Sequence, residues 1–229
     1  MNDFNCECSG CQFRNVAFST LEGEQVSDLC KFRKEYVFQK GGIIHKEGDP
    51  IQDFKYLKSG LVKIFRINKR GDEQIIAITR PFEFVSNMSI FSEDNYKYCV
   101  SAIEESVICS IKLDYIRELI AGNGHFALEL MTKISKISDK IILQTLDIRN
   151  RNLIGRVAYI LLYFAKDIYG TTVFDLPVSR KEIADYISMS TANVIRTLSD
   201  FRKEGTIKLY GKTVEILDIE RLGVISIRG

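Results

Sequence analysis

Two serines in the last third of the chain have the spacing of helix caps. Ser179 is followed three residues later by Glu182, so its hydroxyl can accept a hydrogen bond from a free backbone amide while the carboxylate reaches back to the helix start. Ser190 can cap a second helix in the same way, and Ser188 and Met189 lie between the two. The pattern predicts two short helices joined by a tight turn.

The second helix, from Thr191 to about Lys203, has two different faces. One face is apolar, with Val194, Leu198 and Phe201. The opposite face presents Thr191, Ala192, Asn193, Ile195, Arg196, Ser199 and Arg202. An exposed Arg196 near the helix start can donate two hydrogen bonds to a guanine in the major groove of DNA.

Two more cations suit contacts with DNA phosphates. Arg180 begins the first helix, and Lys212 lies in a Tyr210–Gly211–Lys212 turn that predicts a β-hairpin, or wing. The candidate DNA-binding residues are therefore Ser179, Arg180, Ser190, Thr191, Asn193, Arg196 and Lys212. The alternative is a capped helical hairpin that merely packs in a core, but caps, turn and wing together favour DNA binding.

Enzymatic chemistry finds little support. The chain has two histidines, His45 and His125, too few for a histidine-rich metal site, and no glycine-rich phosphate loop is evident. A third alternative is a ligand-binding roll that serves another protein, which the winged helix at 179–217 disfavours.

The net charge is only +2, although residues 149–229 hold 13 lysines or arginines against 9 acidic residues.

Composition also bears on the compartment. No apolar stretch reaches the roughly 18 residues that a membrane span requires, and the N-terminus lacks the basic and apolar segments of a secretory signal. We expect a cytoplasmic protein with no membrane partner. In that compartment the six cysteines do not indicate a disulfide framework.

The first half of the chain predicts a sensor domain built of strands. Residues 19–34 predict a short helix with Ser19 or Thr20 as its cap, and residues 36–111 hold short β-branched or aromatic runs between turn signals. This spacing is typical of an antiparallel β-roll of the jelly-roll kind, at residues 1–124.

A long helix follows at 125–149. Ala127, Leu130, Ile134, Ile137, Ile141, Gln144 and Ile148 recur in steps of three and four, as in a coiled-coil seam. At about 37 Å the helix is too long for one small roll to cover. We expect residues 125–150 to form a homodimer through this seam. The alternative is an intramolecular core helix with a wide apolar face, because Met131, Ile142, Leu143 and Leu146 are apolar too.

The rest of the chain completes an α+β fold. A helix at 151–169 and a strand at 172–176 precede the two capped helices. The predicted order is a β-roll at 1–124, a dimerisation helix at 125–150 and a winged helix-turn-helix domain at 151–229.

Several motifs resemble one known family. Those of the C-terminal region, Ser179–Ala184, Ser190–Arg196 and Gly211–Thr213, look like the winged helix of the Crp/Fnr regulators. Those of the roll, Tyr56–Lys63 and Arg70–Ile75 among them, look like the cyclic-nucleotide-binding roll, closest to the fumarate-nitrate branch. The resemblance covers nearly the whole chain. It implies a dimer that binds a two-fold symmetric DNA site and recruits RNA polymerase.

The chain departs from the family at two sites. Ala192 stands where family members usually place a glutamate in the recognition helix, so the DNA half-site is expected to differ. In the roll, Ser86 and Asn87 replace the Gly-Glu pair of the nucleotide-binding branch, and no Arg-Ser pair follows. Lys97 could still pair with an anion in such an effector pocket, or simply be solvated. Cyclic AMP is therefore not expected to be the effector.

The resemblance also implies an iron–sulfur cluster or a thiol-based sensor. Cys8, Cys11 and Cys109 match the ligand positions of the oxygen-sensing branch, but Ala17 stands in place of its next cysteine. Cys6 could substitute, giving Cys6, Cys8, Cys11 and Cys109. The alternative is a flexible tail with incidental thiols and an ordinary buried Cys109.

Overall fold

The computed structural model describes residues 19–21, 24–85 and 89–228. They form two compact units. One holds the described residues up to Arg66 together with Ile76–Ile141, and the other holds Ile67–Ile75 and the described residues from Ile142 onward. No helix in these ranges is long and apolar enough to cross a membrane.

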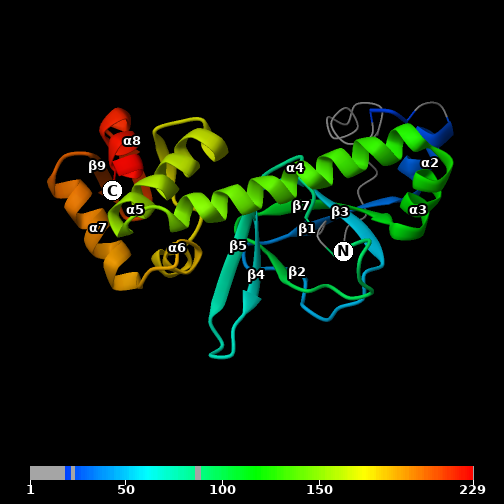
Figure 1. Ribbon diagram of the computed structural model, residues 1–229, viewed down its shortest axis with the longest axis horizontal. Coiled ribbons are helices and arrows are strands. Elements are labelled where there is room, and N and C mark those ends of the chain that lie inside the picture. The colour runs from blue at the N-terminus through cyan, green and yellow to red at the C-terminus, as the bar shows by residue number, and fades with distance from the viewer. Residues whose placement is uncertain (1–18, 22–23, 86–88, 229) are drawn as a thin grey trace. The chain divides into compact units, whose positions relative to one another are not determined.

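The strands between Arg33 and Lys112 form a roll of two sheets (Figure 1). The first sheet has the order β1 (Arg33–Phe38), β7 (Ser106–Lys112), β3 (Asp53–Ser59), and both pairings are antiparallel. The second has the order β2 (Ile43–His45), β6 (Cys99–Ala102), β4 (Val62–Ile67), β5 (Glu73–Thr79). Side chains from both sheets, including Leu57, Val62, Val100 and Ile108, share one apolar core. The predicted antiparallel roll is confirmed.

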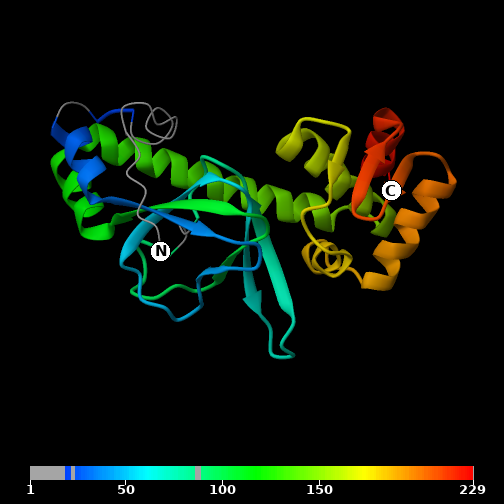
Figure 2. The same ribbon diagram turned by 180° about the vertical axis from the view of Figure 1, so that it is seen from behind.

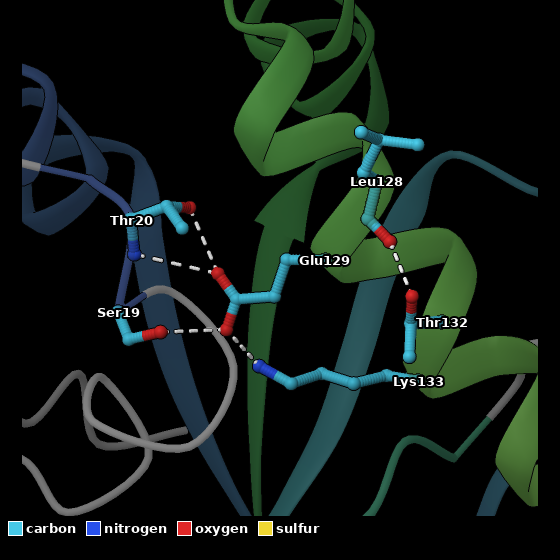
Figure 3. A network of polar contacts seen from close by, with 6 residues as sticks. All are labelled: Ser19, Thr20, Leu128, Glu129, Thr132 and Lys133. Atoms are coloured by element: carbon cyan, nitrogen blue, oxygen red, sulfur yellow. Dashed lines mark hydrogen bonds and ion pairs between the residues drawn. The ribbon is translucent and has the colours of Figure 1, made fainter.

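The N-terminal helix is shorter than expected. Helix α2 spans Glu24–Phe32, and β1 follows it directly. Ser19 and Thr20 do not cap it. Their hydroxyls instead donate to the carboxylate of Glu129, at 2.7 and 2.8 Å, and Lys133 binds the same carboxylate (Figure 3). The cap prediction was wrong because the partner lies 110 residues away from Ser19 in the sequence.

Three helices cover the first sheet. Helix α3 (Leu113–Gly122) and the start of helix α4 (Gly124–Arg149) lie at the same end of the roll as α2 (blue and green, left in Figure 2). Leu29 of α2, Ile116 of α3 and Phe126 of α4 meet in one buried apolar cluster. This burial anchors α4 on its own chain.

The predicted coiled-coil seam faces the protein's own core, so this part of the prediction was wrong. Leu130 is 1% exposed, and Ile134 and Ile137 pack against the same cluster. Ile141 packs against the core between the two sheets. Two further members are also engaged: the Gln144 side chain hydrogen-bonds to Tyr159, and Ile148 is buried. The intramolecular alternative is correct for this face.

A second apolar face of α4 is open. Leu128 and Met131 are each 64% exposed and Ile142 is 57% exposed, and Leu146 is exposed as well. These four residues, with Ser135 between them, recur at helical spacing and lie about a quarter turn from the buried seam. We call Leu128, Met131, Ser135, Ile142 and Leu146 the open stripe of α4.

The second unit carries the winged helix. Helix α5 (Leu153–Tyr163) continues as the π-helix η2 (Phe164–Tyr169), where a single helix had been predicted. Strands β8 (Val173–Asp175), β10 (Thr213–Ile216) and β9 (Ile207–Tyr210) form an antiparallel sheet in that order. Helices α6 (Arg180–Tyr186), α7 (Thr191–Lys203) and α8 (Ile219–Arg228) complete it.

Candidate nucleic-acid interface

The capping box at the start of α6 is confirmed. The Glu182 amide donates to Ser179 Oγ at 3.2 Å, and the Ser179 amide donates to Glu182 Oε2 at 2.8 Å. These bonds satisfy amides that the first helical turn leaves free. They fix where α6 begins.

The turn between α6 and α7 is short and has defined geometry. Ser188 adopts a left-handed conformation with φ of +55°, and the Met189 amide donates to the Ala184 carbonyl at 2.8 Å. The Ser190 hydroxyl then accepts the Asn193 amide at 3.2 Å and caps α7. Both the tight turn and the second cap are confirmed.

Helix α7 divides as predicted. Val194, Leu198 and Phe201 are buried, while Ala192, Ile195, Arg196 and Arg202 are exposed; Thr191, Asn193 and Ser199 are half-buried. The Arg196 guanidinium makes no ion pair or hydrogen bond with any residue that the structure describes. Its donors are therefore available to a ligand.

The wing is a two-residue hairpin. Tyr210 pairs with Thr213, which leaves Gly211 and Lys212 as the turn, and Gly211 has φ of +63°, as the first position of a type II′ turn requires. Arg180 Nη2 donates to the Gly211 carbonyl at 3.0 Å. Arg180 is half-buried, and burial lowers its pKa. Arg180, which was predicted to bind a phosphate, thus uses one of its guanidinium nitrogens to hold the wing against α6.

Lys212 is exposed at the tip of the wing. Its Nζ lies 2.7 Å from Asp175 Oδ2, and the Thr213 hydroxyl donates to Asp175 Oδ1 at 2.6 Å. The hydrogen bonds from Lys212 and Thr213 lower the pKa of Asp175. The ammonium is oriented by Asp175 yet open to solvent, a position that suits a phosphate contact.

Arg156 and Tyr210 were not among the predicted DNA-binding residues. Arg156, near the start of α5, binds four backbone carbonyls on two segments. Tyr210 is 60% exposed beside the wing turn. Tyr210 had been named only as part of the predicted turn, and its place directly before Gly211 and Lys212 was the available signal. A hydrogen bond from a side chain to a distant backbone carbonyl leaves no sequence pattern.

Of the three roll residues named as an effector pocket, the structure describes Lys97. Ser86 and Asn87 lie outside the described residues. Lys97 points to solvent and pairs with Glu93 at 3.2 Å, while its neighbours Tyr96 and Tyr98 are buried. This placement favours the solvated alternative for Lys97.

Of the four predicted thiolate ligands, the structure describes Cys109. It is fully buried, its thiol donates to Glu35 Oε1 at 3.6 Å, and burial raises its pKa to about 12. A metal binds cysteine as thiolate, so Cys109 would have to lose this proton to act as a ligand. The described residues contain no group of three His, Cys, Asp or Glu that could hold a metal, and Cys6, Cys8 and Cys11 lie outside them.

Comparison with known proteins agrees with this architecture. The model of the cyclic nucleotide-binding domain matches residues 35–123, and that of the Crp-like helix-turn-helix domain matches residues 155–225. Together they cover the roll and the winged helix in the predicted order.

Relatives match along most of the chain. Regulatory protein HlyX of Actinobacillus pleuropneumoniae is 27% identical over 95% of this chain and 92% of its own length. A CRP-like cAMP-activated global transcriptional regulator of Mycobacterium tuberculosis is 29% identical over 90% and 93%, respectively. The structure of FixK2 from Bradyrhizobium japonicum shares the fold, with a TM-score of 0.75 and 20% identity over 84% of this chain and 96% of that one. The chain belongs to the Crp/Fnr family of DNA-binding transcription regulators, which act as dimers and are not enzymes.

Proposed function

We propose that this regulator binds a two-fold symmetric DNA site as a homodimer, with the start of α7 in the major groove. The observation that carries the proposal is the surface of α7. Its buried face holds the helix on the domain, and the exposed face offers Thr191, Asn193 and Arg196 next to the capped N-terminus. Base edges are read from this end of a recognition helix.

Arg196 is the main base-reading residue in this proposal. Its unpaired guanidinium matches the O6 and N7 acceptors of guanine, a contact worth about 1–3 kcal/mol of discrimination. Asn193 lies one turn before it and suits an adenine. Ala192 offers no acceptor to a cytosine amine, so the half-site differs from that of relatives with an acidic residue there.

The remaining candidate residues serve the phosphate backbone. The hydroxyls of Ser179 and Ser190 accept a backbone amide and still have an O–H to donate to a phosphate oxygen. Lys212 supplies a charge from the wing, and Arg180, which holds the wing through the Gly211 carbonyl, supplies a second. Such contacts give affinity and register without sequence information.

The open stripe of α4 is the dimer interface in this proposal. The predicted seam is already occupied by the chain's own core, whereas Leu128, Met131, Ile142 and Leu146 are exposed. Two copies of one helix that pair through such a stripe bury it by two-fold symmetry.

The site also implies a role in transcription. We infer that the dimer, acting in the cytoplasm, contacts RNA polymerase and that the roll receives a signal. For the signal, an iron–sulfur cluster or thiol sensor at Cys6, Cys8, Cys11 and Cys109 is the second candidate. As a ligand, the buried Cys109 thiol would have to give up its hydrogen bond to Glu35.

Selection from random duplexes tests the function. Wild-type protein should enrich a two-fold site with half-site centres about one helical turn apart. Arg196→Ala should lose about 1–3 kcal/mol on that site and relax preference at one guanine in each half-site. Arg202→Ala, farther along the same exposed face, is the control and should keep the base preference. A selected site without symmetry, or an unchanged preference in Arg196→Ala, contradicts the proposal.

A further inference from the structure

One guanidinium joins two segments of the DNA-binding unit. Arg156 Nε donates to the Arg151 carbonyl at 3.0 Å, and Nη2 donates to the Arg149 carbonyl at 3.3 Å. Its Nη1 donates to the carbonyls of Ile187 and Ser188, at 3.2 and 3.3 Å. Arg149 is the last residue of α4 and Arg151 lies two residues beyond it, while the other two carbonyls belong to the turn between α6 and α7.

The chemistry explains why an arginine occupies this position. The last carbonyls of a helix have no partner inside it and carry partial negative charge. Both α4 and α6 end here, so carbonyls from two helix ends converge on one cation. A planar guanidinium has five donors in a fixed fork, and lysine cannot reproduce that geometry.

The two segments carry the two halves of DNA recognition. Ile142 and Leu146 of the open stripe lie in the last turns of α4, just before the carbonyls that Arg156 binds. On the other side, the Ile187–Ser188 turn leads within two residues to the Ser190 cap, where the base-reading end of α7 begins.

From this geometry we infer that Arg156 is a positioning residue that sets the separation and orientation of the two recognition helices, and thereby the half-site spacing that the dimer accepts. The inference rests on the proposed function. One extra base pair between half-sites moves them by about 3.4 Å and rotates them by about 35°. If Arg156 links α4 rigidly to the turn before α7, the dimer cannot follow this displacement, and binding to the lengthened site is weaker.

Loss of Arg156 should loosen this link without unfolding the unit. Arg151 separately attaches the end of α4 to its neighbours: its Nε donates to Ser226 Oγ at 3.2 Å, and its guanidinium lies 4.5 Å from the centre of the Tyr159 ring. Ile183, Val194 and Leu198 are buried in the core of this unit, whereas Arg156 is only half-buried.

The test compares affinities for three duplexes: the selected two-fold site, the same site with one base pair inserted at its centre, and a single half-site. The spacing penalty is the ratio of the first two dissociation constants. The spacing penalty should fall about 2- to 30-fold in Arg156→Gln, because residues that couple two sites typically change the coupling by that factor. The affinity for the single half-site should stay the same. Arg156→Lys keeps the charge but not the fork, so its penalty should fall too. Lys166→Gln removes one exposed charge from the same unit and should match wild type.

Each other result overturns the inference. An unchanged penalty in Arg156→Gln, a wild-type penalty restored by Arg156→Lys, or an equal weakening on all three duplexes would show that Arg156 does not set spacing. If Arg156→Gln fails to fold by circular dichroism, Arg156→Lys decides alone. If wild-type protein selects no two-fold site, the proposed function fails instead; a wild type that binds but tolerates the insertion refutes only the role of Arg156.

Discussion

Ile141 and Ile142 are neighbours in the sequence with opposite expected roles. Ile142 lies on the open stripe of α4, 57% exposed, whereas Ile141 packs against the core between the sheets of the roll. Replacing each with glutamate therefore separates the dimer from the fold. Ile142→Glu should yield a folded monomer, and Ile141→Glu should lower the free energy of unfolding.

The magnitude follows from the exposed area. Full burial of an isoleucine side chain contributes about 1.5–3 kcal/mol, so burying the exposed part of Ile142 on dimerisation contributes about 1–2 kcal/mol per protomer. Two-fold symmetry doubles this to about 2–4 kcal/mol, which corresponds to a dimer that is about 30- to 700-fold weaker. The introduced carboxylates repel each other and must also be desolvated, which adds to the loss.

Sedimentation velocity over a range of protein concentrations measures this effect, with circular dichroism as the check on folding. Lys136→Glu changes an exposed residue away from the open stripe and serves as the control, which should stay dimeric. The reasoning is refuted if folded Ile142→Glu dimerises as tightly as wild type. It is equally refuted if Ile141→Glu gives a stable monomer, because then the predicted seam would be the interface.

Four further outcomes are expected. His45 stacks on Tyr96, and burial lowers its pKa to about 3. His45 therefore stays neutral in the folded protein, whereas it is protonated in the unfolded chain below about pH 6.5. Urea titrations should show that the free energy of unfolding falls by about 2 kcal/mol from pH 7 to pH 5, and that this fall is absent in His45→Phe. Arg180→Ala should release the wing and weaken binding to all duplexes alike, lowering the log–log salt slope by about one unit; a loss confined to one base position would contradict this. Calorimetry should detect no micromolar binding of cyclic AMP, because Lys97 points away from the roll. If a cluster forms with Cys109 as its fourth ligand, the visible absorbance after anaerobic purification should disappear in Cys109→Ser; absorbance that persists would leave Cys109 as an ordinary buried thiol against Glu35.

Local patterns in the sequence were enough for the winged helix. The caps at Ser179 and Ser190 and the turn at Gly211 depend on residues within a few positions of one another, and each appears where it was predicted. The strand-rich roll was predictable for the same reason, because alternation and turn residues are local signals.

Partners distant in the sequence were decided only by the tertiary structure. Ser19 and Thr20 bind Glu129, and the hydroxyl that resembles a cap does not reveal this. Which apolar face of α4 is buried also could not be predicted, because Ile141 and Ile142 are equally apolar and only packing on the roll distinguishes them. Arg156 shows the same limit. Its four acceptors are backbone carbonyls, which every residue has, so nothing in the sequence distinguishes them until the fold brings two helix ends to one guanidinium.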